Sequence, residues 1–93
     1  MLIIGSNSYL TYERNKVWKD DLTLWNDNAE KAPNLARPIF GRGYAYSELG
    51  QWDKAIADYS RALEIDPDYA TVYFSRGFAY RNINQWDRAI ADY

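Results

Sequence analysis

The residues best suited to chemistry in this sequence are two close pairs of carboxylates. Asp20 and Asp21 are adjacent, and Asp66 and Asp68 lie on either side of a proline. Paired carboxylates can act as acid and base or bind a divalent cation. Aspartate also favours helix starts and turns, where it caps backbone N–H groups or is solvated. We interpret both pairs in this second way and predict neither a catalytic residue nor a metal site.

Histidine and cysteine are both absent from the 93 residues. Their absence removes most nucleophile–base pairs, proton shuttles and zinc or thiolate sites. Gly41 and Gly43 lie two residues apart, but the pattern around them is helical, so they do not form a phosphate-binding loop after a strand. We therefore predict a protein that is not an enzyme and that uses no cofactor.

The charges are balanced, with 11 basic and 13 acidic residues and a net charge of −2. No basic stripe is present, which argues against a nucleic-acid partner. The apolar run that opens the chain, Met1–Ile4, is far too short to span a membrane. We expect a soluble chain whose large aromatic share, 17%, helps to build a small core.

A tandem repeat of 34 residues determines the elements that must position any site. Residues 36–59 align with residues 70–93, and 14 of the 24 aligned pairs are identical. Two segments of helical pattern in each copy are separated by Gly50 or Asn84, which tolerate the left-handed conformation that ends a helix. Asp66 precedes a proline and is therefore driven out of helical geometry. The first full unit thus predicts one helix ending near Gly50 and another from about residue 52 to 65.

The spacing of aromatic, small and proline residues resembles the tetratricopeptide-repeat (TPR) family. The residues that carry the resemblance are Ile39, Arg42, Gly43, Tyr46, Ala55, Tyr59 and Pro67, then Tyr73, Arg76, Gly77, Tyr80, Ala89 and Tyr93. It implies an all-α fold, a right-handed α-solenoid of antiparallel helix hairpins with five to six helices. Small Gly43 and Ala55 would touch across a hairpin. Arg42 and Arg76 stand where the family prefers Leu, and we expect their long stems to carry the charge to solvent.

We predict one TPR-like domain over residues 1–93, made of three units. The units are a degenerate first hairpin at residues 2–35, a full repeat at 36–69 and a repeat truncated in its second helix at 70–93. Trp18, Trp52 and Trp86 fall in register across the three units. We interpret these rings as core packing rather than as a ligand-stacking ladder.

In TPR proteins the first helix of each hairpin lines a concave groove that binds a protein or peptide. The matching positions in this chain are Arg37, Phe40, Tyr44, Ser47 and Glu48, then Thr71, Phe74, Phe78, Arg81 and Asn82, and in the degenerate unit Ile3, Ser6, Leu10, Glu13 and Arg14. The Phe and Tyr rings would form the floor of the groove and anchor an extended or helical peptide. The alternative is that these rings only pack between adjacent helices. Some TPR domains clamp a terminal carboxylate with Lys and Asn in one repeat and Lys and Arg in the next. The corresponding positions are Phe40 and Tyr44, then Thr71 and Ser75, so that subclass is excluded.

Three functions follow from the resemblance. The first is a non-enzymatic scaffold that binds a protein or peptide in the groove. The second is an aqueous, substrate-recruiting appendage of a multi-pass, glycosyltransferase-like membrane protein. Residues 12–38 resemble the segment that joins the last membrane helix to the first repeat in such prokaryotic proteins, and Met1–Ile4 would end that helix. The third is an oligomerisation module, because the pattern stops at Tyr93 within a helix and we expect the uncovered end to self-associate. The compartment would be the aqueous side of a membrane in the second case and the cytoplasm otherwise.

Overall fold

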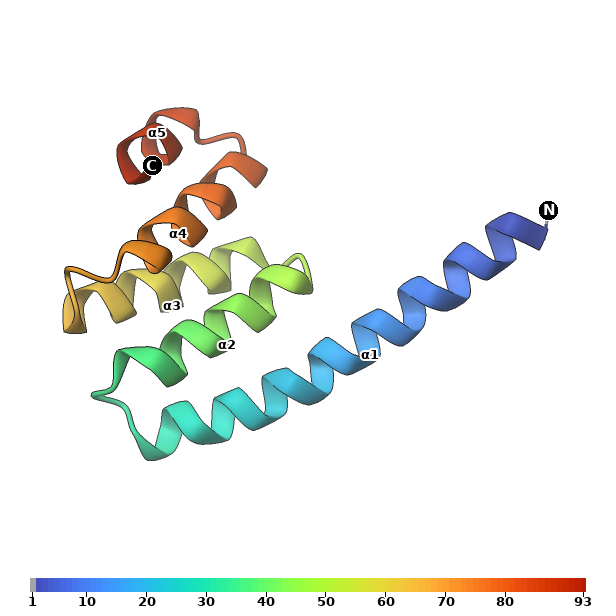
Figure 1. Ribbon diagram of the computed structural model, residues 1–93, viewed down its shortest axis with the longest axis horizontal. Helices are drawn as coiled ribbons and strands as arrows, with labels where there is room; N and C mark the ends of the chain where they lie inside the picture. Colours follow the sequence, from blue (N-terminus) through green and yellow to red (C-terminus); the bar gives the residue numbers. More distant parts are fainter. Residues whose placement is uncertain (1) are drawn as a thin grey trace.

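The computed structural model describes the backbone of residues 2–93 and the side chains of residues 15–93. The helices are α1 (Leu2–Lys31), α2 (Ala36–Glu48), α3 (Trp52–Ile65), α4 (Ala70–Asn82) and α5 (Trp86–Asp92). Each helix packs against the next one along the chain, and α2 also contacts α4. Successive helices run in alternating directions and stack side by side (Figure 1). The predicted all-α solenoid of helix hairpins is confirmed.

The turns between the helices of each hairpin use the residues that the repeat predicted. Gly50 has φ 75° and Asn84 has φ 63°, and both therefore adopt the left-handed conformation. The backbone N–H of Gln51 donates to the carbonyl of Tyr46 at 2.9 Å, and the corresponding bond one repeat later is also 2.9 Å long. The two turns are therefore copies of one motif.

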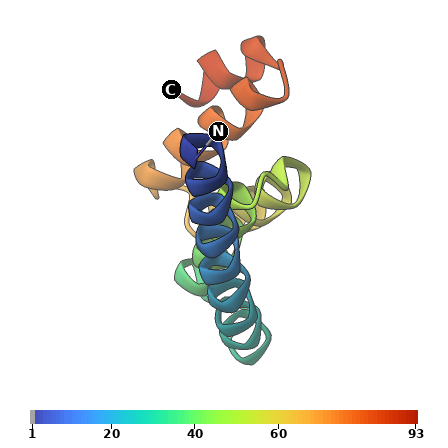
Figure 2. The same ribbon diagram turned by 90° about the vertical axis from the view of Figure 1, so that its right-hand side faces the viewer.

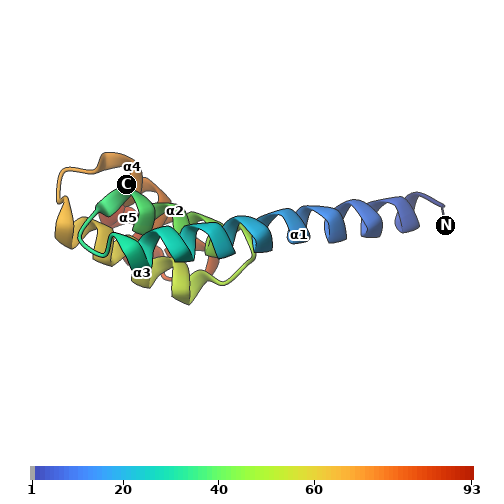
Figure 3. The same cartoon turned by 90° about the horizontal axis from the view of Figure 1, so that it is seen from below.

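The hairpin predicted at residues 2–35 is wrong, because the single helix α1 runs from Leu2 to Lys31. Lys16 occupies the position that Gly50 and Asn84 hold in the later units. Lysine favours a helix and does not favour the left-handed conformation, so the chain continues without a turn. The N-terminal half of α1 projects away from the other helices (Figures 1 and 3), and in Figure 2 it points toward the viewer. Its C-terminal half lies beside α2 and takes the place of the second helix of a repeat.

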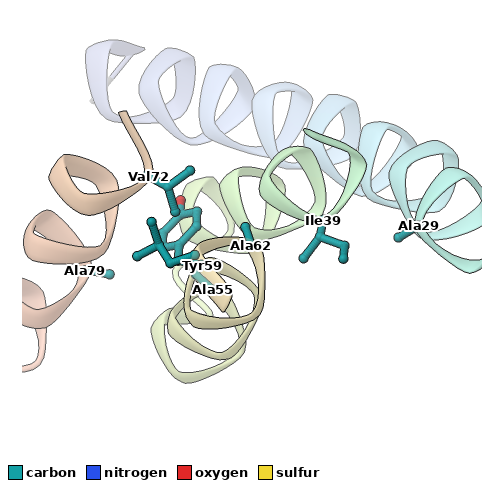
Figure 4. Packing of buried hydrophobic residues seen from close by; sticks show 8 residues of the cluster. Ala29, Ile39, Ala55, Tyr59, Ala62, Val72 and Ala79 are labelled. Carbon is teal, nitrogen blue, oxygen red and sulfur yellow. The ribbon is translucent and has the colours of Figure 1, made fainter. Parts of the chain in front are cut away.

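The core is built from alanines and branched aliphatic residues around one large ring. Its buried members are Ala29, Ile39, Ala55, Tyr59, Ala62, Leu63, Val72 and Ala79 (Figure 4). Tyr59 is 1% exposed and is the largest of the fully buried side chains. A Cβ on Gly43 would lie 2.9 Å from this ring and 3.0 Å from Cβ of Asp58. The atoms nearest to Gly43 therefore belong to Asp58 and Tyr59, about one turn beyond Ala55.

In the next hairpin, Gly77 of α4 lies close to another small residue, Ala89 of α5. A Cβ on Gly77 would lie 3.2 Å from the carbonyl oxygen of Ala89 and 2.9 Å from the ring of Tyr93. Both hairpins thus need a glycine where an aromatic ring of the second helix crosses the first. This follows from sterics, since any side chain at Gly43 or Gly77 would push the helices apart.

Arg42 pairs with a carboxylate and does not extend to solvent, so the prediction for this residue is wrong. Its Nε and Nη2 atoms donate to the two carboxylate oxygens of Asp58 at 2.8 and 2.7 Å. Nη1 donates to Oδ1 of Asn26, on α1, at 3.1 Å. Asp58 is only 6% exposed, and its hydrogen bonds raise the pKa of Arg42. The side chain therefore joins α1, α2 and α3.

The same network recurs one repeat later. Arg76 donates to both carboxylate oxygens of Asp92 at 2.8 Å and to Oγ of Ser60 at 3.2 Å. Hydrogen bonding to Asp92 raises the pKa of Arg76 as well. No buried side-chain nitrogen or oxygen in the described region lacks a hydrogen-bond partner. In the same region, no helix combines the length and apolar character that a membrane span requires.

Candidate functional site

The N-terminal end of α2 borders a hollow of about 400 Å³, which we name the first hollow. It is lined by Trp25, Arg37, Phe40, Gly41, Tyr44 and Tyr69. The aromatic rings come from three places: the C-terminal half of α1, the exposed side of α2 and the turn before α4. A Cβ on Gly41 would lie 2.6 Å from the Trp25 ring, so glycine at this position lets α1 approach α2 closely.

A second hollow of about 240 Å³ lies between α2 and α4. It is lined by Tyr44, Ser47, Glu48, Tyr59, Phe74, Ser75 and Phe78. Tyr44 borders both hollows, so the two spaces adjoin along one side of α2. Seven of the ten groove positions that we name for the full and truncated repeats therefore line one surface: Arg37, Phe40, Tyr44, Ser47, Glu48, Phe74 and Phe78.

The two hollows are copies of one site in successive repeats. The lining pairs Trp25/Tyr59, Phe40/Phe74, Gly41/Ser75 and Tyr44/Phe78 are each 34 residues apart. They differ in charge, because the counterpart of Arg37 is Thr71, which does not line the second hollow. The repeat thus produces two adjoining ring-lined spaces, only one of which has a cation at its edge.

One ring of this surface packs between helices, and the others remain accessible. Phe40 is half-buried, with its centroid 5.7 Å from that of Tyr59 and 5.5 Å from that of Tyr69. Tyr44, Phe74 and Phe78 keep 43%, 65% and 44% of their surface exposed. Phe40 therefore fits the interpretation of a ring packed between helices, and the other three could still contact a ligand.

Two tryptophans of α1 also reach this surface, although the sequence analysis assigned neither to the groove. The ring of Trp18 lies 5.6 Å from that of Tyr44, and Trp25 lines the first hollow. Seven residues separate these tryptophans, which places them on one side of a helix two turns apart. That spacing, together with the match of Trp25 to Tyr59 in the 34-residue register, could have indicated that both tryptophans face this surface.

Arg81 and Asn82 lie on α4 but line neither hollow. The guanidinium of Arg81 stacks 5.9 Å from the centroid of the Trp86 ring, and the amide of Asn82 donates to the carbonyl of Phe78 at 2.8 Å. Trp86, at the start of α5, is 53% exposed, so it is less buried than its counterpart Trp52. The side chains of the groove positions in the degenerate unit, and those of Met1–Ile4, lie outside the described residues.

The electrostatics of the surface differ from end to end. Arg37 is exposed and makes no hydrogen bond or ion pair with a described residue. Glu48 lies near the other end of α2 and lines the second hollow. Burial raises the pKa of Tyr59 to about 12, an effect that the carboxylate of Glu48 reinforces and a hydrogen bond with Ser47 opposes. Within the described region, no cluster of acidic residues could hold a metal ion.

Comparison with known proteins finds a family model that matches part of the chain and solved structures with a similar fold. The profile described as "TPR repeat" matches residues 43–84, from the C-terminal half of α2 to the turn after α4. No curated protein matches the sequence. The structure of MamA AMB-1 in crystal form P212121 is similar, with a TM-score of 0.76 and 24% identity over 90% of this chain and 51% of that one.

Two further solved structures have the same fold. MamA AMB-1 in crystal form C2221 gives a TM-score of 0.74 and 27% identity, covering 89% of this chain and 50% of that one. The Arabidopsis OM64 TPR domain gives 0.80 and 22% identity, covering 94% of this chain and 77% of that domain. The chain spans about half the length of both MamA structures.

Proposed function

We propose that this chain, of which residues 43–84 match the TPR repeat profile of a family of protein-interaction scaffolds, binds a protein or peptide segment on the surface of the two hollows. The proposed activity is non-enzymatic. Its ligand lies across α2 and α4 and is held by side chains that enter the ring-lined spaces on either side of Tyr44.

The observation that carries this proposal is the pair of adjoining hollows with accessible rings. Tyr44, Phe74 and Phe78 expose large apolar area on one continuous surface, where burial against a ligand would be favourable. Each aliphatic or aromatic side chain of a ligand that is buried there contributes roughly 1.5–3 kcal/mol before the cost of association. Two such anchors supply about 3–6 kcal/mol, less than the roughly 8 kcal/mol of a micromolar complex, so polar contacts with the ligand must add to them.

The dimensions of α2 indicate the size of the ligand. Arg37 and Glu48 lie eleven residues apart, which corresponds to about 16 Å along a helix. An extended segment covers that distance with about five residues. The proposed ligand is therefore a short linear segment with two apolar side chains rather than a large folded surface.

The test uses peptides selected from a random dodecapeptide library displayed on phage, with the wild-type chain as bait. Fluorescence anisotropy then measures the dissociation constant of each enriched peptide for the wild type and for the double variant Tyr44→Ala/Phe74→Ala. We expect at least a tenfold weakening in the double variant, because both hollows lose a ring. Ile90→Ala on α5 is the matched control, since Ile90 is exposed and lines neither hollow.

Circular dichroism must show that all variants keep their helix content. Equal affinities of the wild type and the double variant would contradict the proposal, as would an equal loss in the Ile90→Ala control.

A further inference from the structure

We infer that the first hollow recognises an internal acidic residue of the bound segment, next to an apolar side chain. The carboxylate pairs with Arg37, and the apolar side chain enters the space bordered by Trp25, Phe40, Tyr44 and Tyr69. This inference rests on the proposed function and adds the chemistry of the partner to it.

Folding does not explain the position of Arg37. It is the second residue of α2, where the helix dipole disfavours a positive charge. The first turn of α2 contains no acidic residue, and Arg37 makes no bond to any residue in the described part of the chain. Every other arginine of the chain in that part forms an ion pair or stacks on an aromatic ring; these are Arg42, Arg61, Arg76, Arg81 and Arg88. Arg37 is thus a cation that the fold leaves available at the edge of a hollow.

The hollow and its cation suit one particular pair of ligand groups. Four aromatic rings and about 400 Å³ of space accommodate an apolar side chain. A guanidinium beside such a space can donate two parallel hydrogen bonds to a carboxylate, and that interaction strengthens as the rings and the ligand exclude water. A cationic ligand, which aromatic rings alone would attract, is repelled here by the charge of Arg37.

Charge complementarity also sets the direction of the ligand. The second hollow has Glu48 in its lining and contains no basic residue, whereas the first has Arg37 and no acidic residue. An acidic side chain is therefore attracted to the N-terminal end of α2, where Arg37 lies and where the helix dipole is positive. The bound segment places its acidic residue over the first hollow and its second apolar anchor over the other.

A side-chain carboxylate fits better than the carboxylate of a chain terminus. Capture of a chain terminus generally uses several convergent donors, such as a backbone nest or a group of basic and amide side chains. The lining of the first hollow offers one guanidinium and, beyond it, only aromatic residues and a glycine. We therefore assign the site to an Asp or Glu within the segment.

The experiment uses the dodecapeptides enriched on the wild-type chain, synthesised with an acetylated N-terminus and an amidated C-terminus. Side chains are then the only source of carboxylate. Each acidic residue of a peptide is replaced in turn by its amide, and dissociation constants are measured at low salt for the wild type, Arg37→Ala and Arg37→Glu. Arg37 is exposed and unpaired within the described structure, so these variants are expected to fold.

We expect one acidic position whose change to the amide weakens wild-type binding about tenfold and has little effect on binding to Arg37→Ala. Changing the same position to Lys should give a peptide that Arg37→Glu prefers to the acidic one. Arg61→Glu serves as the control, because Arg61 lies on α3 in an exposed pair with Glu64 and should leave the peptide preference unchanged.

Two outcomes separate this inference from the proposed function. Peptides that depend on Tyr44 and Phe74 but show no coupling between an acidic position and Arg37 would overturn the inference and leave groove binding intact. A library that yields no peptide, or only peptides that bind the Tyr44→Ala/Phe74→Ala variant equally well, would overturn both.

Discussion

Arg42 and Asp58 form a bidentate ion pair across the hairpin of α2 and α3, and Arg76 and Asp92 form the same pair across α4 and α5. Each arginine has a third contact with the helix before its hairpin, to Asn26 on α1 in the first case. The pair therefore connects neighbouring units as well as the two helices of one unit. In a solenoid, stability is approximately the sum of such unit and interface contributions.

Removing Asp58 should destabilise the chain strongly. In Asp58→Ala the guanidinium of Arg42 loses its partner in a partly buried place, and we expect a loss of about 3 kcal/mol in the free energy of unfolding. Glu64→Ala breaks the exposed pair with Arg61 and should cost less than about 1 kcal/mol. Urea unfolding followed by circular dichroism measures both values, and equal losses would show that the pair is not a stabilising element.

The left-handed residues of the two turns, Gly50 and Asn84, predict opposite effects of substitution on stability. Gly50→Ala meets no steric obstacle but must adopt φ 75°, which costs about 1 kcal/mol. Asn84→Gly relieves the same conformation at φ 63° and should be neutral or slightly stabilising. Thermal melts of the two variants test the assignment, and a destabilised Asn84→Gly with an unchanged Gly50→Ala would refute it.

Trp52 and Trp86 occupy the same position of the repeat, but neighbouring side chains cover them to different extents. The ring of Phe78 packs edge-on against Trp52, with centroids 5.9 Å apart, whereas Trp86 is 53% exposed. We expect Trp52→Ala to cost about 2–4 kcal/mol and Trp86→Ala clearly less. Matched urea melts measure the difference, which should vanish if the covering ring contributes nothing.

Tyr59 should make the chain sensitive to high pH. Its pKa is about 12 in the fold and near 10 in the unfolded chain, because burial disfavours the tyrosinate. The unfolded chain therefore loses this proton first as the pH rises, and the contribution of the neutral phenol is complete below pH 10. We expect the free energy of unfolding to fall by about 2–3 kcal/mol between pH 10 and pH 12 through this group.

The variant Tyr59→Phe isolates this titration from that of the other tyrosines. Its free energy of unfolding should depend less steeply on pH across the same interval than that of the wild type. Parallel curves for the two proteins would mean that Tyr59 does not titrate as its burial implies.

The sequence predicted the elements that depend on local chemistry. The bounds of α3 and the turns at Gly50 and Asn84 agree with the structure, because a left-handed residue and a proline act on their immediate neighbours. The continuity of α1 was missed because the prediction relied on the alignment of Trp18 with Trp52. It gave too little weight to Lys16, which does not favour the left-handed conformation of a turn.

The site was predictable to a similar extent. The 34-residue register gave the positions of Phe40, Tyr44, Phe74 and Phe78 on α2 and α4, but not the cover that neighbouring segments supply. Tyr69 reaches the first hollow from the turn before α4, a position outside the helices to which the family pattern assigns the groove. The pairing of Arg42 with Asp58 was missed in the same way, since it depends on how α2 crosses α3.

The most direct test of the binding surface uses the tryptophan indole N–H signals in a ¹H–¹⁵N NMR titration with the tightest selected peptide. The chain has four tryptophans, of which Trp25 lines the first hollow and Trp86 lies on α5, away from both hollows. We predict that the indole signal of Trp25 shifts on saturation while that of Trp86 stays in place. A shift of Trp86 with an unmoved Trp25 would contradict the account and place the ligand elsewhere.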